Sequence, residues 1–306
     1  ADNAQINLTR FNLFYPEKRE FFLTRSKLFA FGNSRQTEVF FSRKIGLNQD
    51  VVGGARMFGQ IGKTSVGALN IHTQADGDLP ATHYSAIRLR KDVRDRTTVG
   101  AIITDVSSKG VRNSVYGIDG QMRFWGNSSV SAWYSQVQDG QFDKPSEASM
   151  IKVDLKNDRY FFTAGQHRVD KNFHPALGFV QRNDMVGTGA IMGFTPRVGN
   201  GEEVIRQMRF TLYVRDVKNL EGLSETSIIN GGIDAIFESR DKIGIKIINE
   251  KGVNLTSVPE ISISLKSLEF LRGNIVFTRL KVGSLTANFS FSEQEGLHNE
   301  FSSNYG

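Results

Sequence analysis

Histidine, serine and cysteine are the first residue types to test for chemistry. The five histidines are His72, His83, His167, His174 and His298. No two of them have the close spacing with which one strand or helix shares a metal ion, so the sequence predicts no metal site. The chain has no cysteine, which removes thiolate ligands and a cysteine nucleophile. We therefore predict no cofactor.

Nucleophilic catalysis would need a serine beside a histidine. The sequence has no G-x-S-x-G elbow and no Gly-rich phosphate loop followed by Lys and Ser or Thr. His83 and Ser85 are two residues apart and share one face of a strand, and His167 with Ser135 is a second conceivable pair. Serine is too common in this chain for either pair to single out a catalytic site. The sequence therefore favours a protein that is not an enzyme.

A stronger signal is the segment FYPEKREFFL, residues 14 to 23, which places Pro16 and four charges between two aromatic pairs. A soluble core would exclude the charges, and a strand facing lipid would exclude both the charges and the proline. The segment is expected to pack in an enclosed, polar place as a plug or constriction, or to act as a plain connector on a rim. The residues that would form this plug are Phe14, Tyr15, Glu17, Lys18, Arg19, Glu20, Phe21 and Phe22.

From about residue 38 onward the sequence alternates with period two, which is typical of strands. In YGIDGQMRF, Tyr116, Ile118 and Met122 fall on one side, while Asp119 and Arg123 fall on the other. Short polar or glycine-bearing links alternate loosely with longer ones, as in an up-and-down meander. We expect roughly 14 to 18 strands. There is no run of eighteen apolar residues, so no transmembrane helix is predicted.

The charges in the middle of strands indicate which face meets which solvent. An arginine facing lipid near the bilayer midplane costs about 2 to 4 kcal/mol, whereas the interior of a wide barrel is polar and wet. We therefore predict a transmembrane antiparallel β-barrel with aromatic residues such as Tyr84, Tyr116 and Trp133 near the membrane interfaces. A soluble β-sandwich stays the alternative, because its strands alternate too. The residues expected to line the lumen are Arg43, Arg56, Arg88, Arg90, Asp119, Arg123, Arg209, Arg215 and Asp234.

SRKIG and GARMFG carry the positive charges of Arg43, Lys44 and Arg56, near this segment in the sequence. We expect them on the first two strands, where they could pair with Glu17 and Glu20 and hold the segment in place. Otherwise they would form a solvated lumen face.

Several ordered motifs between residues 1 and 185 resemble one known family. They are AQINLTRFNLFYPEKREFFL, FFSRKIGL, GGARMFGQIG, SVGALNIHT, VYGIDGQMRF and HPALGFVQR. The chain is similar here to Gram-negative outer-membrane β-barrels of unassigned function, whose full-length members carry an N-terminal domain similar to family 9 carbohydrate-binding modules. The resemblance implies a plug or periplasmic-mouth segment over 1–37 and a barrel over 38–306. It also implies a native chain that extends beyond both ends of this one.

These observations lead to one functional expectation and two alternatives. We expect an outer-membrane channel or transporter, or the membrane anchor of a periplasmic carbohydrate-binding-like domain. The implied partners are the lipid bilayer and other outer-membrane or periplasmic proteins. Nucleic acid is not expected, because the net charge of +6 is spread along the chain. The alternatives are a hydrolase embedded in the outer membrane and a soluble β-rich binding protein.

Overall fold

A computed structural model describes residues 14–47, 49–198, 204–238, 242–252, 258–265, 281–282 and 285–291 of the 306-residue chain. The expected segment and barrel therefore both extend outside the described residues. Strands dominate, as predicted. The helical elements of the described chain are the single turn α1 (Glu20–Leu23) and the 3-10 turns η1 (Ser26–Leu28) and η2 (Ser42–Lys44). The all-β fold class is confirmed.

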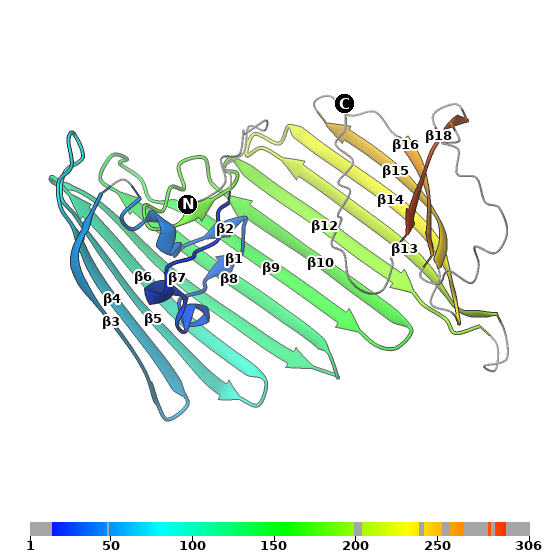
Figure 1. The fold of residues 1–306 in the computed structure, drawn as a ribbon, viewed down its shortest axis with the longest axis horizontal. Coiled ribbons are helices and arrows are strands. Elements are labelled where there is room, and N and C mark those ends of the chain that lie inside the picture. The colour runs from blue at the N-terminus through cyan, green and yellow to red at the C-terminus, as the bar shows by residue number, and fades with distance from the viewer. Residues whose placement is uncertain are drawn as a thin grey trace. The chain divides into compact units, whose positions relative to one another are not determined.

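Fifteen strands form one large sheet (Figure 1). Its strands are β3 (Val51–Ile61), β4 (Thr64–Thr73), β5 (Thr82–Arg94), β6 (Thr97–Ser108), β7 (Val111–Phe124), β8 (Ser128–Asp139), β9 (Ser146–Lys156), β10 (Tyr160–Val169), β12 (Met185–Phe194), β13 (Ile205–Lys218), β14 (Ser224–Phe237), β15 (Lys242–Gly252), β16 (Val258–Leu265), β17 (Lys281–Val282) and β18 (Leu285–Phe291).

Each strand from β3 to β9 pairs antiparallel with the next one, which is the predicted meander. Further along the chain, β14 pairs antiparallel with β15 and β15 with β16, whereas β16 pairs parallel with β18. Within the described residues the order of the sheet ends at β3 on one side and at β17 on the other. The sheet is open there, so closure into a barrel stays a prediction.

Tight turns explain why neighbouring strands pair in register. Lys109 and Gly110 link β6 to β7, and both have a positive φ, of 44° and 81°. Two successive positive φ angles match the primed turns that suit the twist of a hairpin. Trp125 and Gly126 repeat this feature between β7 and β8, with φ angles of 39° and 68°.

The chain divides into two compact units, and the first holds residues 1–157, 162–190 and 215–225. One face of its sheet, here called the apolar face, carries exposed hydrophobic side chains in register. Ile87 lies opposite Ile103, and Ile103 lies opposite Tyr116. Ile118 is 62% exposed. The apolar face carries Met57, Ile61, Ile87, Leu89, Val99, Ile103, Tyr116, Ile118, Met122, Tyr134, Ile151 and Leu155.

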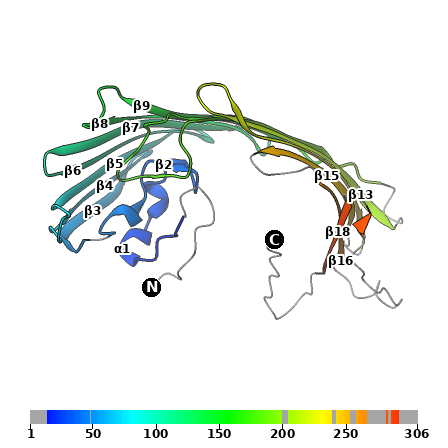
Figure 2. The same cartoon turned by 90° about the horizontal axis from the view of Figure 1, so that it is seen from above.

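The other face of this sheet is here called the covered face. It carries the alternate side chains, including Arg88, Arg90, Asp119 and Arg123. Residues 14–47, here called the N-terminal segment, lie against it (Figure 2). The mid-strand charges of Arg88, Asp119 and Arg123 thus lie on the face opposite to the exposed hydrophobic side chains of this unit.

In the second unit the same alternation holds within its own strands. Ile233 of β14 lies opposite Ile245 of β15, and both are exposed. Asp234 takes the other face of β14. The rings of Tyr160, Phe194 and Phe210 form a ladder, with centroid distances of 4.8 and 6.2 Å.

The N-terminal segment is folded, and it is joined to the connection between β10 and β12. A small sheet contains β1 (Gly32–Asn33), β2 (Thr37–Glu38) and β11 (Phe179–Val180), and β2 pairs with both of the others. The segment continues past the predicted boundary at residue 37, since the first long strand begins at Val51.

The predicted placement of Arg43 and Lys44 on the first strands is wrong, because both residues lie in η2. The run FFSRKIGL that contains them does not join the large sheet. Ile45 and Ser42 are instead buried in the segment, and the Phe41 amide donates to the Leu177 carbonyl at 2.7 Å.

Two hydrophobic clusters fill the space between the segment and the covered face. In one, Phe31 and Val39 of the segment pack with Ile102, Val115 and Trp133 of the sheet. In the other, Phe22, Phe29 and Ile45 pack with Leu69, Ile71, Tyr84 and Leu177. A uniformly polar lumen is therefore wrong for this part of the face, because the docked segment provides a dry partner for apolar side chains. For the same reason Tyr84 and Trp133 belong to this core and not to an interface belt.

Glycines on the covered face make room for the segment, which can be tested at Gly117. A Cβ added there would lie 2.5 Å from Phe31 Cζ, whereas one added at Gly120 of the same strand meets its nearest atom at 3.7 Å. Gly117→Ala should destabilise the docked segment by about 1 to 3 kcal/mol through overpacking, as measured by its protease susceptibility. Gly120→Ala is the matched control. Equal susceptibility of the two variants would contradict this packing.

Candidate functional site: the docked N-terminal segment

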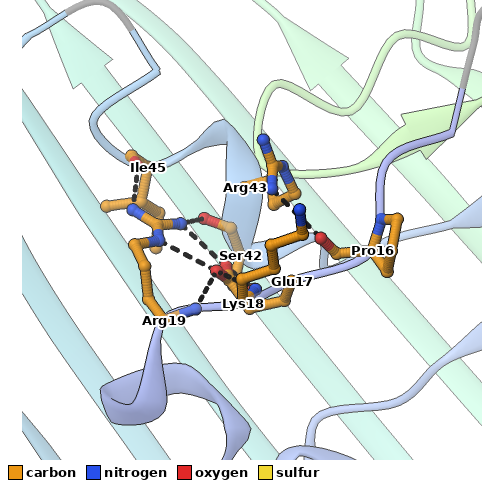
Figure 3. Close-up of polar contacts among 7 residues, drawn as sticks. All are labelled: Pro16, Glu17, Lys18, Arg19, Ser42, Arg43 and Ile45. Atoms are coloured by element: carbon orange, nitrogen blue, oxygen red, sulfur yellow. Dashed lines mark hydrogen bonds and ion pairs between the residues drawn. The ribbon is translucent and has the colours of Figure 1, made fainter. Parts of the chain in front are cut away.

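The polar centre of the segment is formed by Glu17, Arg19 and Ser42 (Figure 3). The Arg19 guanidinium donates to both carboxylate oxygens of Glu17, at 2.9 and 2.8 Å. It also donates to the carbonyls of Ile45 and Ser42, each at 2.7 Å. The Ser42 hydroxyl donates to Glu17 at 2.6 Å. These bonds join residues 14–23, here called the charged strip, to the η2 turn. The strip therefore has a fixed conformation.

The electrostatics of Glu17 follow from these contacts. Burial alone would raise the pKa of the Glu17 carboxyl, but the hydrogen bonds from Arg19 and Ser42 outweigh it and lower the pKa from 4.5 to about 2. Glu17 therefore stays ionised at neutral and mildly acidic pH. The cluster of Glu17, Arg19 and Ser42 is here called the clasp.

The positive charges expected to pair with Glu17 and Glu20 have other partners. Arg43 donates to the Pro16 carbonyl at 3.0 Å, and Arg56 of β3 donates to the Thr24 carbonyl. Their guanidinium groups also lie over the rings of Tyr15 and Phe21, at 5.9 and 5.3 Å from the centroids. The predicted role of Arg43 and Arg56 in holding the segment is retained, but through backbone carbonyls and rings.

The rings of the strip divide between several contacts. Phe14 packs on Phe41 and Phe179, with centroids 5.1 and 5.3 Å apart. Phe22 is buried under the Arg19 guanidinium, and its neighbour Phe21 is 48% exposed. Phe21 and Phe22 are in edge contact at 5.0 Å. Phe14 and Phe22 thus anchor the two ends of the strip. The side chains of Lys18, Glu20 and Phe21 are exposed.

Beneath the segment, Arg88 of β5 and Asp119 of β7 form an ion pair on the covered face. The two N–O distances are 2.6 and 2.8 Å, and the Arg88 side chain is 1% exposed. The guanidinium lies 5.3 Å from the Phe31 ring centroid. A Cβ added at Gly100 would lie within 2.6 Å of atoms of both partners. Gly100 is thus the residue that lets the pair cross between β5 and β7.

The remaining residues predicted to line a lumen alternate along their strands with apolar residues, so the two kinds of side chain point to different faces. Arg90 and Arg123 share the covered face with Arg88. In β13, Arg209 and Arg215 alternate with the exposed Phe210 and Leu212. Asp234 does the same beside Ile233. The structure brings Arg88 and Asp119 together but does not join these others into one cluster.

Neither of the two conceivable Ser–His pairs is joined by a hydrogen bond. The Ser85 hydroxyl accepts a hydrogen bond from Asn70 at 2.8 Å, and Ser135 Oγ and His167 Nε2 are buried without hydrogen-bond partners in the structure. One pair of histidines was missed, since the rings of His72 and His83 lie 4.0 Å apart across β4 and β5. Only strand register could have revealed it. No cluster of three or more potential metal ligands occurs among the described residues.

Comparison with known proteins adds no relative. No protein-family model matches the chain, and no curated protein or solved structure is significantly similar to it. In the part of the chain that the structure describes, no helix is both long and apolar enough to cross a membrane.

The clasp predicts a specific pH dependence. Because the pKa of Glu17 is lowered on folding, its stabilising effect is present above its ordinary value of 4.5 and is lost as the pH falls toward about 2. The difference in stability between the wild type and Glu17→Gln should therefore be constant from neutral pH to about pH 5 and shrink below it. Trp133 fluorescence, in a Trp125→Phe background, reports segment docking because the Phe31 ring lies 6.0 Å away.

Glu20→Gln is the control for this experiment, since Glu20 is exposed at the start of α1. The same profile for both variants, or a Glu17→Gln effect that grows in acid, would contradict the clasp.

Proposed function

We propose that this protein is an outer-membrane β-barrel channel or transporter, with its N-terminal segment docked inside as a plug. The observation that carries the proposal is the apolar face. Its side chains run in register from Met57 in β3 to Ile151 in β9, with the small Ala68 as the partner of both Met57 and Ile87 in β4. A contiguous exposed apolar surface of this kind needs a partner, and the hydrocarbon of a bilayer is one that fits every strand equally.

The extent of this surface supports a membrane-spanning role. On the same face the hydrophobic side chains end at a row of polar residues, and each member lies opposite the next across the strands. The row consists of Asn70, Ser85, Asp105, Ser114 and Gln138. Strands β5 to β9 have 11 to 14 residues, and a tilted strand needs about 9 to 11 to cross a bilayer. The polar row fits the level of the lipid headgroups.

The opposite face supports the plug. The covered face buries the Arg88–Asp119 ion pair. The N-terminal segment packs against the same face through two hydrophobic clusters. A soluble protein could bury such a core too, but it would have no use for the apolar residues left bare on the reverse face. The motif resemblance to outer-membrane barrels agrees with this proposal. In such a barrel the same protein could also anchor a periplasmic domain.

The membrane proposal predicts that charge is tolerated differently at two positions of the same face. Ile118→Arg should lower stability in lipid vesicles by about 2 to 4 kcal/mol, whereas Gln138→Arg, in the polar row, should cost at most about 1 kcal/mol. Urea unfolding in vesicles, followed by heat-modifiable gel migration, measures both. In a water-soluble protein the two exposed positions would respond alike. That result, with folding in the absence of detergent or lipid, would contradict the proposal.

The plug proposal predicts a change in conductance. Removal of residues 14 to 23 deletes Glu17 and Arg19 of the clasp and the buried Phe22, so the remaining segment should loosen and single-channel conductance in planar bilayers should rise. The adjacent phenylalanines give a matched pair, because Phe22 is 7% exposed and Phe21 is 48% exposed. Phe22→Ala should increase channel opening, and Phe21→Ala should increase it less, because the Phe21 ring is half exposed, with contacts to Arg56 and Phe22. Unchanged conductance after the deletion would remove the plug.

A further inference from the structure

We infer that the covered face, beyond the docked segment, holds a binding site for small multivalent anions of the phosphate type. The site is a cavity of about 520 Å³ beside the β5–β6 and β7–β8 turns. It lies entirely within the first unit and goes beyond the proposed function, because it can bind its ligand whether or not the protein conducts. Its charged lining residues are Arg96, Arg123, Lys152, Asp154 and Lys156.

Strand register explains why these charges gather. Arg123 of β7 lies opposite Ser129 of β8, and Ser129 lies opposite Asp154 of β9. Lys152 and Lys156 flank Asp154 at two-residue spacing and so share its face. Arg96 joins from the β5–β6 turn, where its carbonyl accepts a hydrogen bond from the Arg123 amide at 2.9 Å. Four cations from the β5–β6 turn, β7 and β9 thus line one cavity.

The cavity is not neutralised by its own side chains. Asp154 is the one carboxylate in the lining, against four cations. It bonds Lys152 at 3.0 Å and accepts a hydrogen bond from Thr163 at 2.7 Å. On the same face, Asp119 is held by Arg88, and Asp92 lies outside the lining. The four cations are solvent-exposed, so water and salt screen their repulsion, but an anion that binds between them should still stabilise the folded protein.

The chemistry of the lining defines the ligand class. Guanidinium groups match phosphate oxygens in a bidentate manner, and lysines add point charges from the side. Gln121, Asn127 and Ser129 provide neutral hydrogen-bonding groups in the same cavity. The volume lies in the range of small-molecule sites and exceeds what a single inorganic phosphate would fill. A compound with two or more phosphate or similar anionic groups fits best.

Titration calorimetry with pyrophosphate tests the site, on the purified full chain in detergent at constant ionic strength. The wild type should bind pyrophosphate, and its thermal midpoint should rise when pyrophosphate replaces chloride. Arg123→Gln combined with Lys152→Gln should weaken binding about tenfold or more, because each lost contact is a charge-assisted hydrogen bond. Lys63→Gln is the matched control, since Lys63 lies in the exposed β3–β4 turn outside the cavity.

Loss of binding in the double variant with retention in Lys63→Gln supports the site. Equal binding by all three proteins, or no binding by the wild type, overturns it. If the double variant does not fold, Arg96→Gln and Lys156→Gln separately carry the same test, and each should weaken binding while Lys63→Gln does not. A negative result here does not change the expected outcome of the vesicle experiment on Ile118. The anion site and the membrane barrel can therefore be disproved independently.

Discussion

The structure depends on one constraint, which is that successive side chains of an extended strand point to opposite faces. Ile118 and Asp119 are neighbours in the chain but face different surroundings, and the register repeats this division from β3 to β9. A one-residue slip in any pairing would bring charges such as Arg88 to the apolar face. The tight turns fix that register, so they are as important to the surfaces as the strands themselves.

The covered face and the N-terminal segment are adapted to one another. Gly67 leaves space for Leu28 and Phe29, Gly117 for Phe31, and Gly100 for the Arg88–Asp119 pair. The clasp at Glu17 then holds the charged strip in a single conformation. This arrangement answers why FYPEKREFFL combines rings with charges. Phe14 and Phe22 anchor the strip in apolar contacts, and the charges bond the backbone and one another.

Period two in the sequence was enough to predict the all-β fold, the meander and the separation of Ile118 from Asp119. It could not predict that residues 42 to 44 form a 3-10 turn, because that turn depends on tertiary contacts that bury Ser42 and Ile45. It also missed the dry core around Trp133 and the basic cavity at Arg123. Both depend on which residues oppose each other across strands, and the register is set by turns far apart in the sequence.

Quenching of tryptophan fluorescence by brominated lipids tests the central claim most directly. Single tryptophans at Ile118, on the apolar face, and at Ser131, on the covered face, would be compared in a background with Phe at 125 and 133. The account predicts strong quenching at position 118 and little at 131, because only the first side chain would contact acyl chains. Equal quenching at the two positions, or none at either, would contradict a sheet with one lipid-facing side.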